Sequence, residues 1–194
     1  FTLGDFTEPM VEVAVFRQFL ADVKATPQAK GIVLDMRGNS GGWDLLYLTL
    51  ASYFFNADNP ISMHWNDQDS YDADKGELVR EFGHKYLLSA PQPELYWGGP
   101  VVVLIDHNCA SSCEFFTQFL QTSDRVTVVG QYASEGAGGP INRVSMPGGV
   151  LFQYTKGRSY FAGTDELNLE AKGVTPDVRV PVTEETVAAN FAGE

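Results

Sequence analysis

The chain has 194 residues, of which 44% are hydrophobic, enough for one well-packed domain with a sizeable core or for two very small ones. Its 13 basic and 25 acidic residues give a formal net charge of −12 and an isoelectric point near 4.5, so nucleic acids and anionic membranes would on average be repelled. No apolar run approaches the ~20 residues of a membrane-spanning helix, so membrane insertion is not expected. The negative charge makes nucleic acid an unexpected partner as well. The first residue is Phe1 rather than Met, and we expect the chain to be cut from something longer.

The N-terminal part of the chain predicts a helix, a strand and a second helix. Pro9–Ala25 opens with a proline suited to the first turn of a helix and carries apolar residues at helical spacing. Gly31–Met36 predicts a short buried strand, and Trp43–Phe55 has the length and apolar spacing of a buried helix. Between them lies the loop Arg37–Gly42, which reads RGNSGG.

This glycine-rich loop stands where a strand passes into a helix, a place that can cradle a phosphate. The spacing of neither a P-loop nor a dinucleotide fingerprint is present, so we reject nucleotide binding. Such a loop can also present backbone N–H groups to a developing oxyanion, since glycine permits close approach of a carbonyl. A tight turn without chemistry fits the same residues equally well.

The segment Asn56–Gly99 predicts an irregular surface excursion with a short helix near Glu77–Phe82. Its spaced acidic residues do not follow the EF-hand loop, so they indicate a solvated acidic face rather than a calcium site. His64 and His84 also lie in this segment, with nothing nearby in the sequence to complete a metal site.

The stretch VVVLIDHNCASSCEFF organises the rest of the chain. Val101–Ile105 predicts a strand buried on both faces, and Glu114–Leu120 carries apolar residues at helical spacing. A small hydroxyl residue between such a strand and helix has an exposed side chain and free N–H groups beside it, which is the geometry of a serine nucleophile. Ser111 or Ser112 could equally be an ordinary helix N-cap.

The two cysteines, Cys109 and Cys113, flank this serine pair. Two cysteines so close make no disulfide framework, and they lack the partner pair of a zinc site. We therefore expect two small buried apolar side chains, with a catalytic cysteine as the alternative.

The C-terminal part of the chain predicts mainly short strands separated by glycine turns. One carboxylate, Glu170, precedes a turn and the last strand near Val178. Together with the earlier elements this gives a mixed α/β domain with flanking helices and C-terminal hairpin strands. The expected elements are strands over Arg125–Gly130, Val144–Pro147, Val150–Thr155 and Arg158–Ala162, and a terminal helix over Thr183–Phe191.

In this order, the pieces resemble the C-terminal (tail-specific) processing peptidase superfamily, which includes tricorn core proteases, the chlamydial protease-like activity factor and interphotoreceptor retinoid-binding protein. The resemblance runs from Gly31 to Pro181 and rests on four motifs in the family's order. They are Gly31–Gly42 (GIVLDMRGNSGG), Pro100–Phe116, Val128–Gly139 and Glu170–Asp177 (EAKGVTPD). The resemblance implies a ClpP/crotonase-like α/β fold and a single serine peptidase catalytic domain over residues 1–194.

The resemblance also implies roles for particular residues. The family nucleophile is the serine three positions before the acidic residue that opens the helix, which is Ser111 here because that acidic residue is Glu114. The implied oxyanion hole consists of the backbone N–H of Ser112 and one N–H from the Gly41-Gly42 turn.

Members of this family differ in the residue that serves as general base. In its Ser-Lys branch a lysine lies in the glycine loop, but Gly136 stands at the matching position, and the loop around it holds no lysine. In the tricorn-like and chlamydial branch a histidine upstream of the first helix is the base, and a glutamate matching Glu170 orients it. We therefore expect the histidine outside this chain, on an upstream segment or a separate chain. His107 is the alternative base, and a structural carboxylate is the alternative role of Glu170.

These implications predict a serine endopeptidase that cleaves extended polypeptides through an acyl-enzyme on Ser111, without metal or organic cofactor. We expect an extracytoplasmic location, periplasmic or secreted. The alternative is an inactive module on the same fold that binds retinoids or fatty acids, as some relatives do. A crotonase-type acyl-CoA enzyme fits less well, because no crotonase motif accounts for the Ser111 segment.

Overall fold

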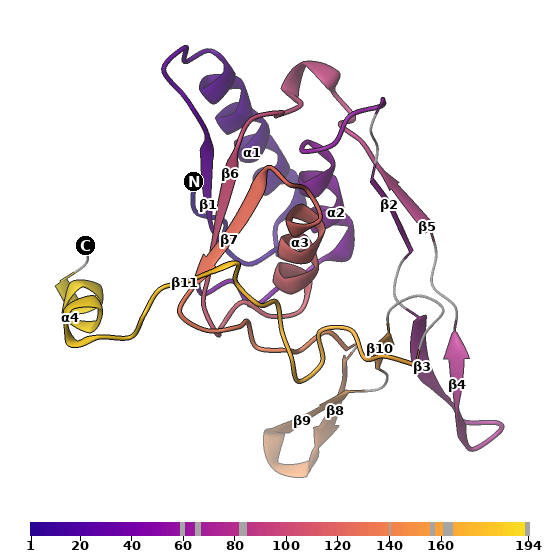
Figure 1. Ribbon diagram of the computed structural model, residues 1–194. Helices are drawn as coiled ribbons and strands as arrows, with labels where there is room; N and C mark the ends of the chain where they lie inside the picture. The colour runs from indigo at the N-terminus through magenta and orange to yellow at the C-terminus, as the bar shows by residue number, and fades with distance from the viewer. Residues whose placement is uncertain are drawn as a thin grey trace.

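The computed structural model describes residues 1–58, 61–64, 67–81, 85–139, 141–155, 158–160 and 165–192 (Figure 1). Its centre is a four-stranded sheet in which every pairing is parallel. The strands, in spatial order, are β1 (Ile32–Asp35), β6 (Val101–Ile105), β7 (Val126–Gly130) and β11 (Val178–Arg179).

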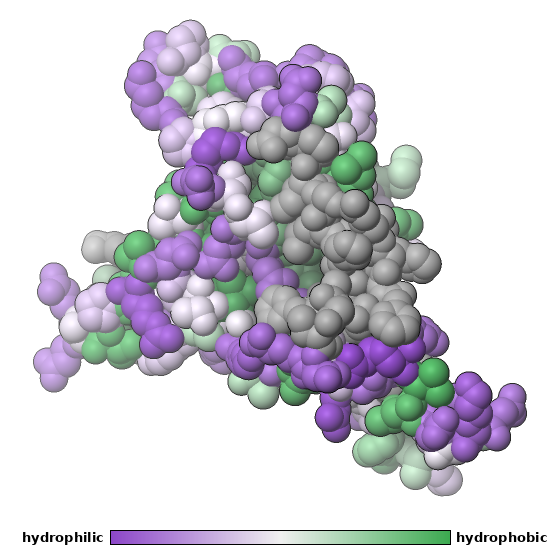
Figure 2. Space-filling view, turned by 45° about the vertical axis from the view of Figure 1, so that its right-hand side comes forward, coloured by the Kyte–Doolittle hydropathy of each residue, from purple (hydrophilic) through white to green (hydrophobic). Residues whose placement is uncertain are grey.

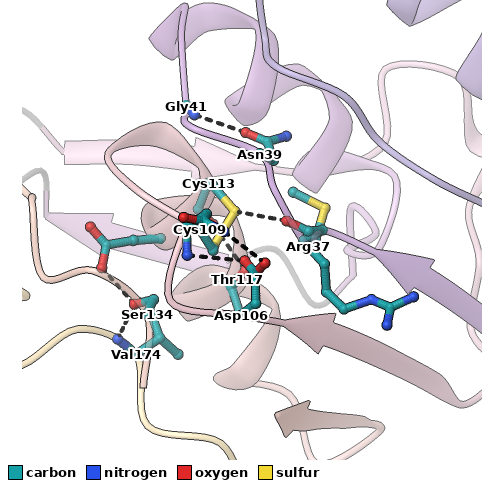
Figure 3. The surroundings of a disulfide bond; sticks show 12 residues. Arg37, Asn39, Gly41, Asp106, Cys109, Cys113, Thr117, Ser134 and Val174 are labelled. Carbon is teal, nitrogen blue, oxygen red and sulfur yellow. Dashed lines mark hydrogen bonds between the residues drawn. A yellow bond between two sulfur atoms is a disulfide. The ribbon is translucent and has the colours of Figure 1, made fainter. Parts of the chain in front are cut away.

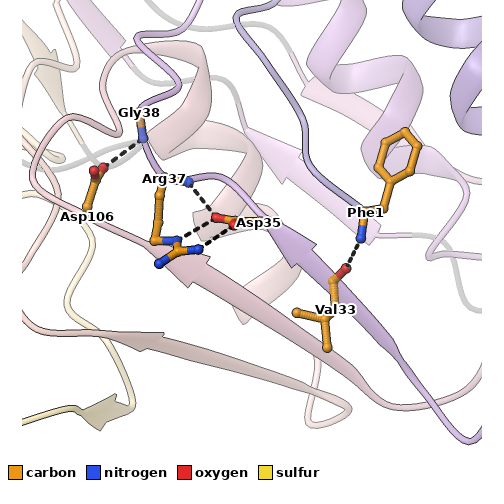
Figure 4. Close-up of polar contacts among 6 residues, drawn as sticks. All are labelled: Phe1, Val33, Asp35, Arg37, Gly38 and Asp106. Carbon is orange, nitrogen blue, oxygen red and sulfur yellow. Dashed lines mark hydrogen bonds and ion pairs between the residues drawn. The ribbon is translucent and has the colours of Figure 1, made fainter. Parts of the chain in front are cut away.

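The N-terminal residues extend this sheet beyond β1. Thr2 forms a parallel bridge with Asp35, and the Phe1 amino group donates a hydrogen bond of 2.9 Å to the Val33 carbonyl oxygen (Figure 4). The first residues of the chain therefore cover the free edge of β1.

Three helices bury their apolar sides against the sheet and against one another. They are α1 (Pro9–Lys24), α2 (Asp44–Ser52) and α3 (Ser112–Gln121). Phe16 of α1 is fully buried, and its ring centroid lies 6.2 Å from that of Tyr53 and 6.1 Å from that of Phe54, just beyond α2. All three helices were expected from apolar periodicity, and the structure confirms them.

The central strands bury one face much more completely than the other. Val101 and Val103 of β6 are buried among the helices, whereas Val102 is half-buried and Val33 of β1 is 49% exposed. The prediction that β6 is buried on both faces is therefore wrong for one face, because α2 and α3 lie on a single side of the sheet (Figure 1).

Short antiparallel pairings lie outside the central sheet. β2 (Ile61–His64) pairs with β5 (Lys85–Leu88), and β8 (Ile141–Met146) pairs with β9 (Val150–Thr155). A third sheet has the order β10-β3-β4, with β3 over Asp67–Asp72, β4 over Glu77–Glu81 and β10 over Ser159–Tyr160. The remaining elements are the 3-10 helices Pro93–Leu95 and Pro147–Gly149 and the helix α4 (Glu184–Ala192), which projects from the rest (Figure 1).

The third sheet corrects one prediction. The helix expected near Glu77–Phe82 is the strand β4, and Phe82 itself lies outside the described residues. A turn with Gly76 at φ +70° reverses the chain, and Arg80 then pairs across the sheet with Asp69 at 2.9 Å. Cross-strand contacts of this kind outweigh local helical spacing in a segment of five residues.

The fold class is confirmed as mixed α/β with flanking helices and a hairpin, β8–β9, toward the C-terminus. On the face seen in Figure 2, hydrophilic residues cover much of the described surface, with smaller hydrophobic patches between them, as the charge of −12 leads one to expect. Among the described residues, no helix combines the length and apolar character needed to span a bilayer.

Candidate active site

Two loops meet at one edge of the central sheet. Because β1 and β6 are parallel neighbours, the loop after β1 and the loop after β6 leave the sheet at the same edge. A hydrogen bond of 3.2 Å from the Ala110 N–H to the Asn39 carbonyl oxygen joins them. The glycine-rich loop and the serine pair, far apart in sequence, therefore lie side by side.

Ser111 occupies a strained turn between this loop and α3. Its φ of 54° and ψ of −121° lie in a region that residues other than glycine rarely adopt, at a cost of about 1–3 kcal/mol. It is the N-cap of α3, and Ser112 is the first helical residue. A strained serine at the start of a helix that follows a buried strand has the geometry of a nucleophile elbow.

Gly41 packs directly against this elbow. A Cβ atom at Gly41 would lie 2.7 Å from the Ala110 carbonyl oxygen, 2.8 Å from the Ser111 Cβ and 2.9 Å from the Ser112 nitrogen. These separations are shorter than real Cβ contacts, and the Gly41 φ of +97° also favours glycine. Both the contacts and the backbone conformation therefore require glycine here.

Two backbone N–H groups next to Ser111 have no hydrogen-bond acceptor in the part of the chain that the structure describes. The Gly41 N–H donates a hydrogen bond of 2.8 Å to the Asn39 side-chain oxygen. Within the described residues, the Gly42 and Ser112 N–H groups have no acceptor. Of the two glycines predicted for an oxyanion hole, Gly42 is thus the one with a free donor, and Asn39 holds the turn that presents it.

The side chain of Ser112 lies away from this role. Its Oγ is 2.8 Å from the Gly42 carbonyl oxygen and 3.0 Å from Asp44 Oδ1 at the start of α2. Ser112 is also completely buried. Its hydroxyl therefore joins the two helix starts. Of the serine pair, Ser111 is the one that lines the cavity described next.

Ser111 lines an open cavity of about 580 Å³ together with Gly41 and Gly42. The hairpin β8–β9 also lines this cavity, and there the Arg143 Nε donates a hydrogen bond of 2.9 Å to Gln153 Oε1. The volume is within the range of typical ligand sites. The serine thus faces a space that can admit part of a substrate.

Glu114 is a buried carboxylate that fastens the elbow to a second glycine loop. It is fully buried and accepts hydrogen bonds from the Ser111 N–H (3.0 Å), the Gly136 N–H (2.7 Å), the Ala137 N–H (2.8 Å) and the Ser134 hydroxyl. Burial raises the pKa of the Glu114 carboxyl, while these four hydrogen bonds act in the opposite direction. The sequence carries one signal for the contact with Ser111: Glu114 stands three residues after Ser111, which is the spacing of a capping box.

Glu170 lies in the cavity next to that of Ser111. It is half-buried and lines a space of about 850 Å³ that shares Ala137, Gly139 and Ile141 with the serine cavity. Its neighbours Leu169 and Ala171 both have positive φ, 65° and 59°. Ser111 does not line this second cavity, so the structure brings the two residues into adjoining spaces rather than one.

The described histidine nearest in sequence to Ser111 belongs to a different cavity. His107 lines a space of about 700 Å³ that Ser111 does not reach. Asp35 and Arg37 lie at the same place, and two hydrogen bonds of 2.8 and 2.7 Å from Arg37 lower the pKa of the Asp35 carboxyl (Figure 4). This arrangement gives no support to His107 as the base. The surroundings of the His64 side chain and the whole of His84 lie outside the described residues.

The two cysteines form a disulfide, Cys109–Cys113, that spans the elbow (Figure 3). Both are fully buried, which confirms the expected burial, but the interpretation as two separate small side chains is wrong. Their Cα atoms are 5.5 Å apart, a separation that a disulfide requires and that the turn at Ser111 creates. Neither sulfur of this pair is a free thiol, so a catalytic cysteine is excluded in this state.

Comparison with known proteins places these features in a family. The sequence model of peptidase family S41 matches residues 2–180. A carboxy-terminal-processing protease of Bartonella bacilliformis (strain ATCC 35685 / KC583 / Herrer 020/F12,63) is 27% identical over 172 residues, which are 87% of this chain and 34% of that protein.

Solved structures share the fold at lower identity. A protein from Parabacteroides merdae ATCC 43184, described as a candidate peptidase, matches 96% of this chain and 55% of its own with a TM-score of 0.72 and 24% identity. The complex of mature CPAF with lactacystin matches 90% of this chain and 43% of its own, with a TM-score of 0.70 and 17% identity. The chain therefore spans about a third to about a half of the length of these similar proteins.

Proposed function

Because the chain belongs to peptidase family S41, we propose that it supplies the catalytic part of a serine-type processing peptidase in which Ser111 is the nucleophile. The observation that carries the proposal is the strained turn at Ser111, which lies beside the N–H groups of Gly42 and Ser112, neither of which has an acceptor among the described residues. A nucleophile next to two preorganised donors is the arrangement that acyl transfer needs.

The chemistry follows from these positions. The Ser111 oxygen attacks the carbonyl carbon of a peptide bond and loses its proton to a general base. The negative charge that develops on the carbonyl oxygen is stabilised by the N–H groups of Gly42 and Ser112, each worth about 3 kcal/mol in such sites. The leaving amine takes a proton from the base, and water then releases the acyl group from Ser111.

We propose that a histidine outside this chain is the base and that Glu170 orients it. The adjoining position of the two cavities supports this, since an imidazole between them could contact both Ser111 and Glu170. The described residues offer no lysine or histidine in the cavity of Ser111, in agreement with a base supplied from elsewhere.

We propose a polypeptide as substrate and an extracytoplasmic location. The cavity of Ser111 is open and borders the exposed hairpin β8–β9, along which an extended chain could lie as an added strand. The Cys109–Cys113 disulfide supports an oxidising compartment, because such bonds are rare in the cytosol.

To test the proposal, the full-length protein is treated with a serine-directed fluorophosphonate, and the adduct is located by peptide mass spectrometry. We expect an adduct on Ser111 in the wild type and none in Ser111→Ala. Ser123→Ala is the matched control: Ser123 lies beyond the end of α3 and should not affect labelling. An unlabelled but folded wild type would contradict the peptidase proposal and favour the ligand-binding module instead.

A further inference from the structure

The Cys109–Cys113 disulfide brackets Ser111, because each cysteine lies two positions from the serine in the sequence. The ring that it closes contains the strained residue and the Ser112 N–H. No other cysteine occurs in the 194 residues. A cross-link over five residues constrains little of the unfolded chain, so its main structural effect is local.

The strain at Ser111 needs such a constraint. A residue with this backbone conformation persists only where its surroundings hold it on both sides. After Ser111 in the sequence, the Cys113 N–H donates a hydrogen bond of 3.0 Å to the Ala110 carbonyl oxygen, and this bond spans the turn. Before Ser111, the Cys109 carbonyl oxygen accepts a hydrogen bond of 3.0 Å from the Glu135 N–H. The disulfide joins these two sides covalently.

The same constraint sets the direction of the oxyanion donors. If the peptide planes next to Ser111 rotated toward ordinary values, the Ser112 N–H would turn away from its place over Gly41. Catalysis is sensitive to such a rotation of the Ser112 N–H, because the donors and the nucleophile must be held in place before the substrate reacts.

We propose that the Cys109–Cys113 disulfide is a positioning element for the reaction: it holds Ser111 and the Ser112 N–H in their reactive arrangement. The proposal rests on the proposed function of Ser111. Reduction by a dithiol or a phosphine adds two electrons and two protons, which converts the disulfide into two thiols while the reductant is oxidised. Acyl transfer should slow, and reoxidation should restore it.

The experiment measures fluorophosphonate labelling of the full-length protein and separates the maximal rate of inactivation from the concentration of half-saturation. Wild type is compared in oxidised, phosphine-reduced and reoxidised form, with the thiol state checked by mass spectrometry. The variant Cys109→Ala/Cys113→Ala is measured with and without phosphine. Thermal unfolding monitored by circular dichroism establishes that each form is folded.

We expect reduction to lower the maximal rate about tenfold or more with little change in half-saturation, because positioning affects the reacting atoms rather than binding. The double variant should be equally slow and insensitive to phosphine. If the double variant does not fold, the maximal rate of the reduced wild type tests the proposal. If the disulfide of the folded protein resists phosphine, the maximal rate of the double variant, or of protein made in a reducing cytosol, tests it instead.

The outcomes separate the two proposals. Equal maximal rates with and without the bond, in folded protein, would overturn the positioning role but leave the proposed function intact. Absence of any Ser111 adduct in the oxidised wild type would instead overturn the proposed function itself.

Discussion

At the scale of the single residue, Gly41 lies where the glycine-rich loop meets the turn at Ser111. A Cβ atom at Gly41 would meet the Ala110 carbonyl oxygen, the Ser111 Cβ and the Ser112 nitrogen, so there is no room for a side chain between the glycine-rich loop and the elbow. By contrast, Gly38 in the same loop also has a positive φ, +77°, but a Cβ there would meet nothing within 4 Å. The two glycines separate backbone strain from steric obstruction.

We predict that Gly41→Ala slows labelling of Ser111 about 100-fold, because the new methyl group would push the Ser112 N–H and Ser111 from their positions. Gly38→Ala should cost about 1 kcal/mol of unfolding free energy but leave the labelling rate within about twofold. Rates from fluorophosphonate labelling and urea unfolding curves measure both. Similar rates for Gly41→Ala and wild type would argue against the oxyanion role of this turn.

At the scale of the element, Glu114 joins the start of α3 to the loop after β7. Its four donors come from the elbow and from residues 134 to 137, so one carboxylate holds both loops. Ser134 continues the contact, because its Oγ also accepts a hydrogen bond of 2.6 Å from the Val174 N–H (Figure 3). The segment that leads out of the Glu170 turn is thereby connected to the elbow.

We predict that Glu114→Gln lowers the free energy of unfolding by about 3 kcal/mol, since an amide would turn an NH₂ group toward backbone donors and leave some of them unpaired. The same change at exposed Glu135, the neighbouring acidic residue of that loop, should cost less than about 0.5 kcal/mol. Urea unfolding followed by circular dichroism compares the two. A loss below about 1 kcal/mol for Glu114→Gln would show that the network contributes little.

At the scale of the whole molecule, Arg125 stabilises the amino ends of the sheet strands, which lie opposite the candidate site. Arg125, which precedes β7, donates hydrogen bonds to the carbonyl oxygens of Phe54 (2.8 Å), Trp97 (3.2 Å) and Gly99 (3.1 Å). These carbonyls belong to the end of the α2 region and to the approach to β6, so one guanidinium joins distant segments. Because the strands are parallel, this edge carries their amino ends and the site carries their carboxyl ends.

We predict that Arg125→Met lowers the unfolding free energy by about 3 kcal/mol, because three carbonyl oxygens lose a charged donor. The labelling rate of the folded fraction should stay unchanged, since the contacts lie at the far edge from Ser111. Arg179→Met, at an exposed arginine of β11, removes the same charge and should cost less than about 0.5 kcal/mol. A large loss of labelling rate in folded Arg125→Met would mean that the two edges of the sheet are coupled.

The main elements could be predicted because their signals are local. The apolar runs of β1, β6 and β7 and the helical spacing of α1 to α3 depend on neighbours a few residues away. The strand β4 could not be predicted in this way, because its partner residues come from β3 and its Arg80 also lies over the ring of Tyr160, 80 residues further along the sequence. The pattern of Glu77–Glu81 alone fits helix and strand alike.

The sequence by itself determined the order of the central strands β1, β6 and β7 and of the helices α1 to α3, the two glycine-rich loops, and the place of the serine pair between a strand and a helix, because these follow from local periodicity and turn chemistry. Only the tertiary structure decided that Gly42 rather than Gly41 has the free N–H, that the cysteines are bonded, and that Glu114 holds two loops together. Each of these depends on distances and angles between groups that the chain brings together only when the sheet forms, and no local pattern in the sequence contains them.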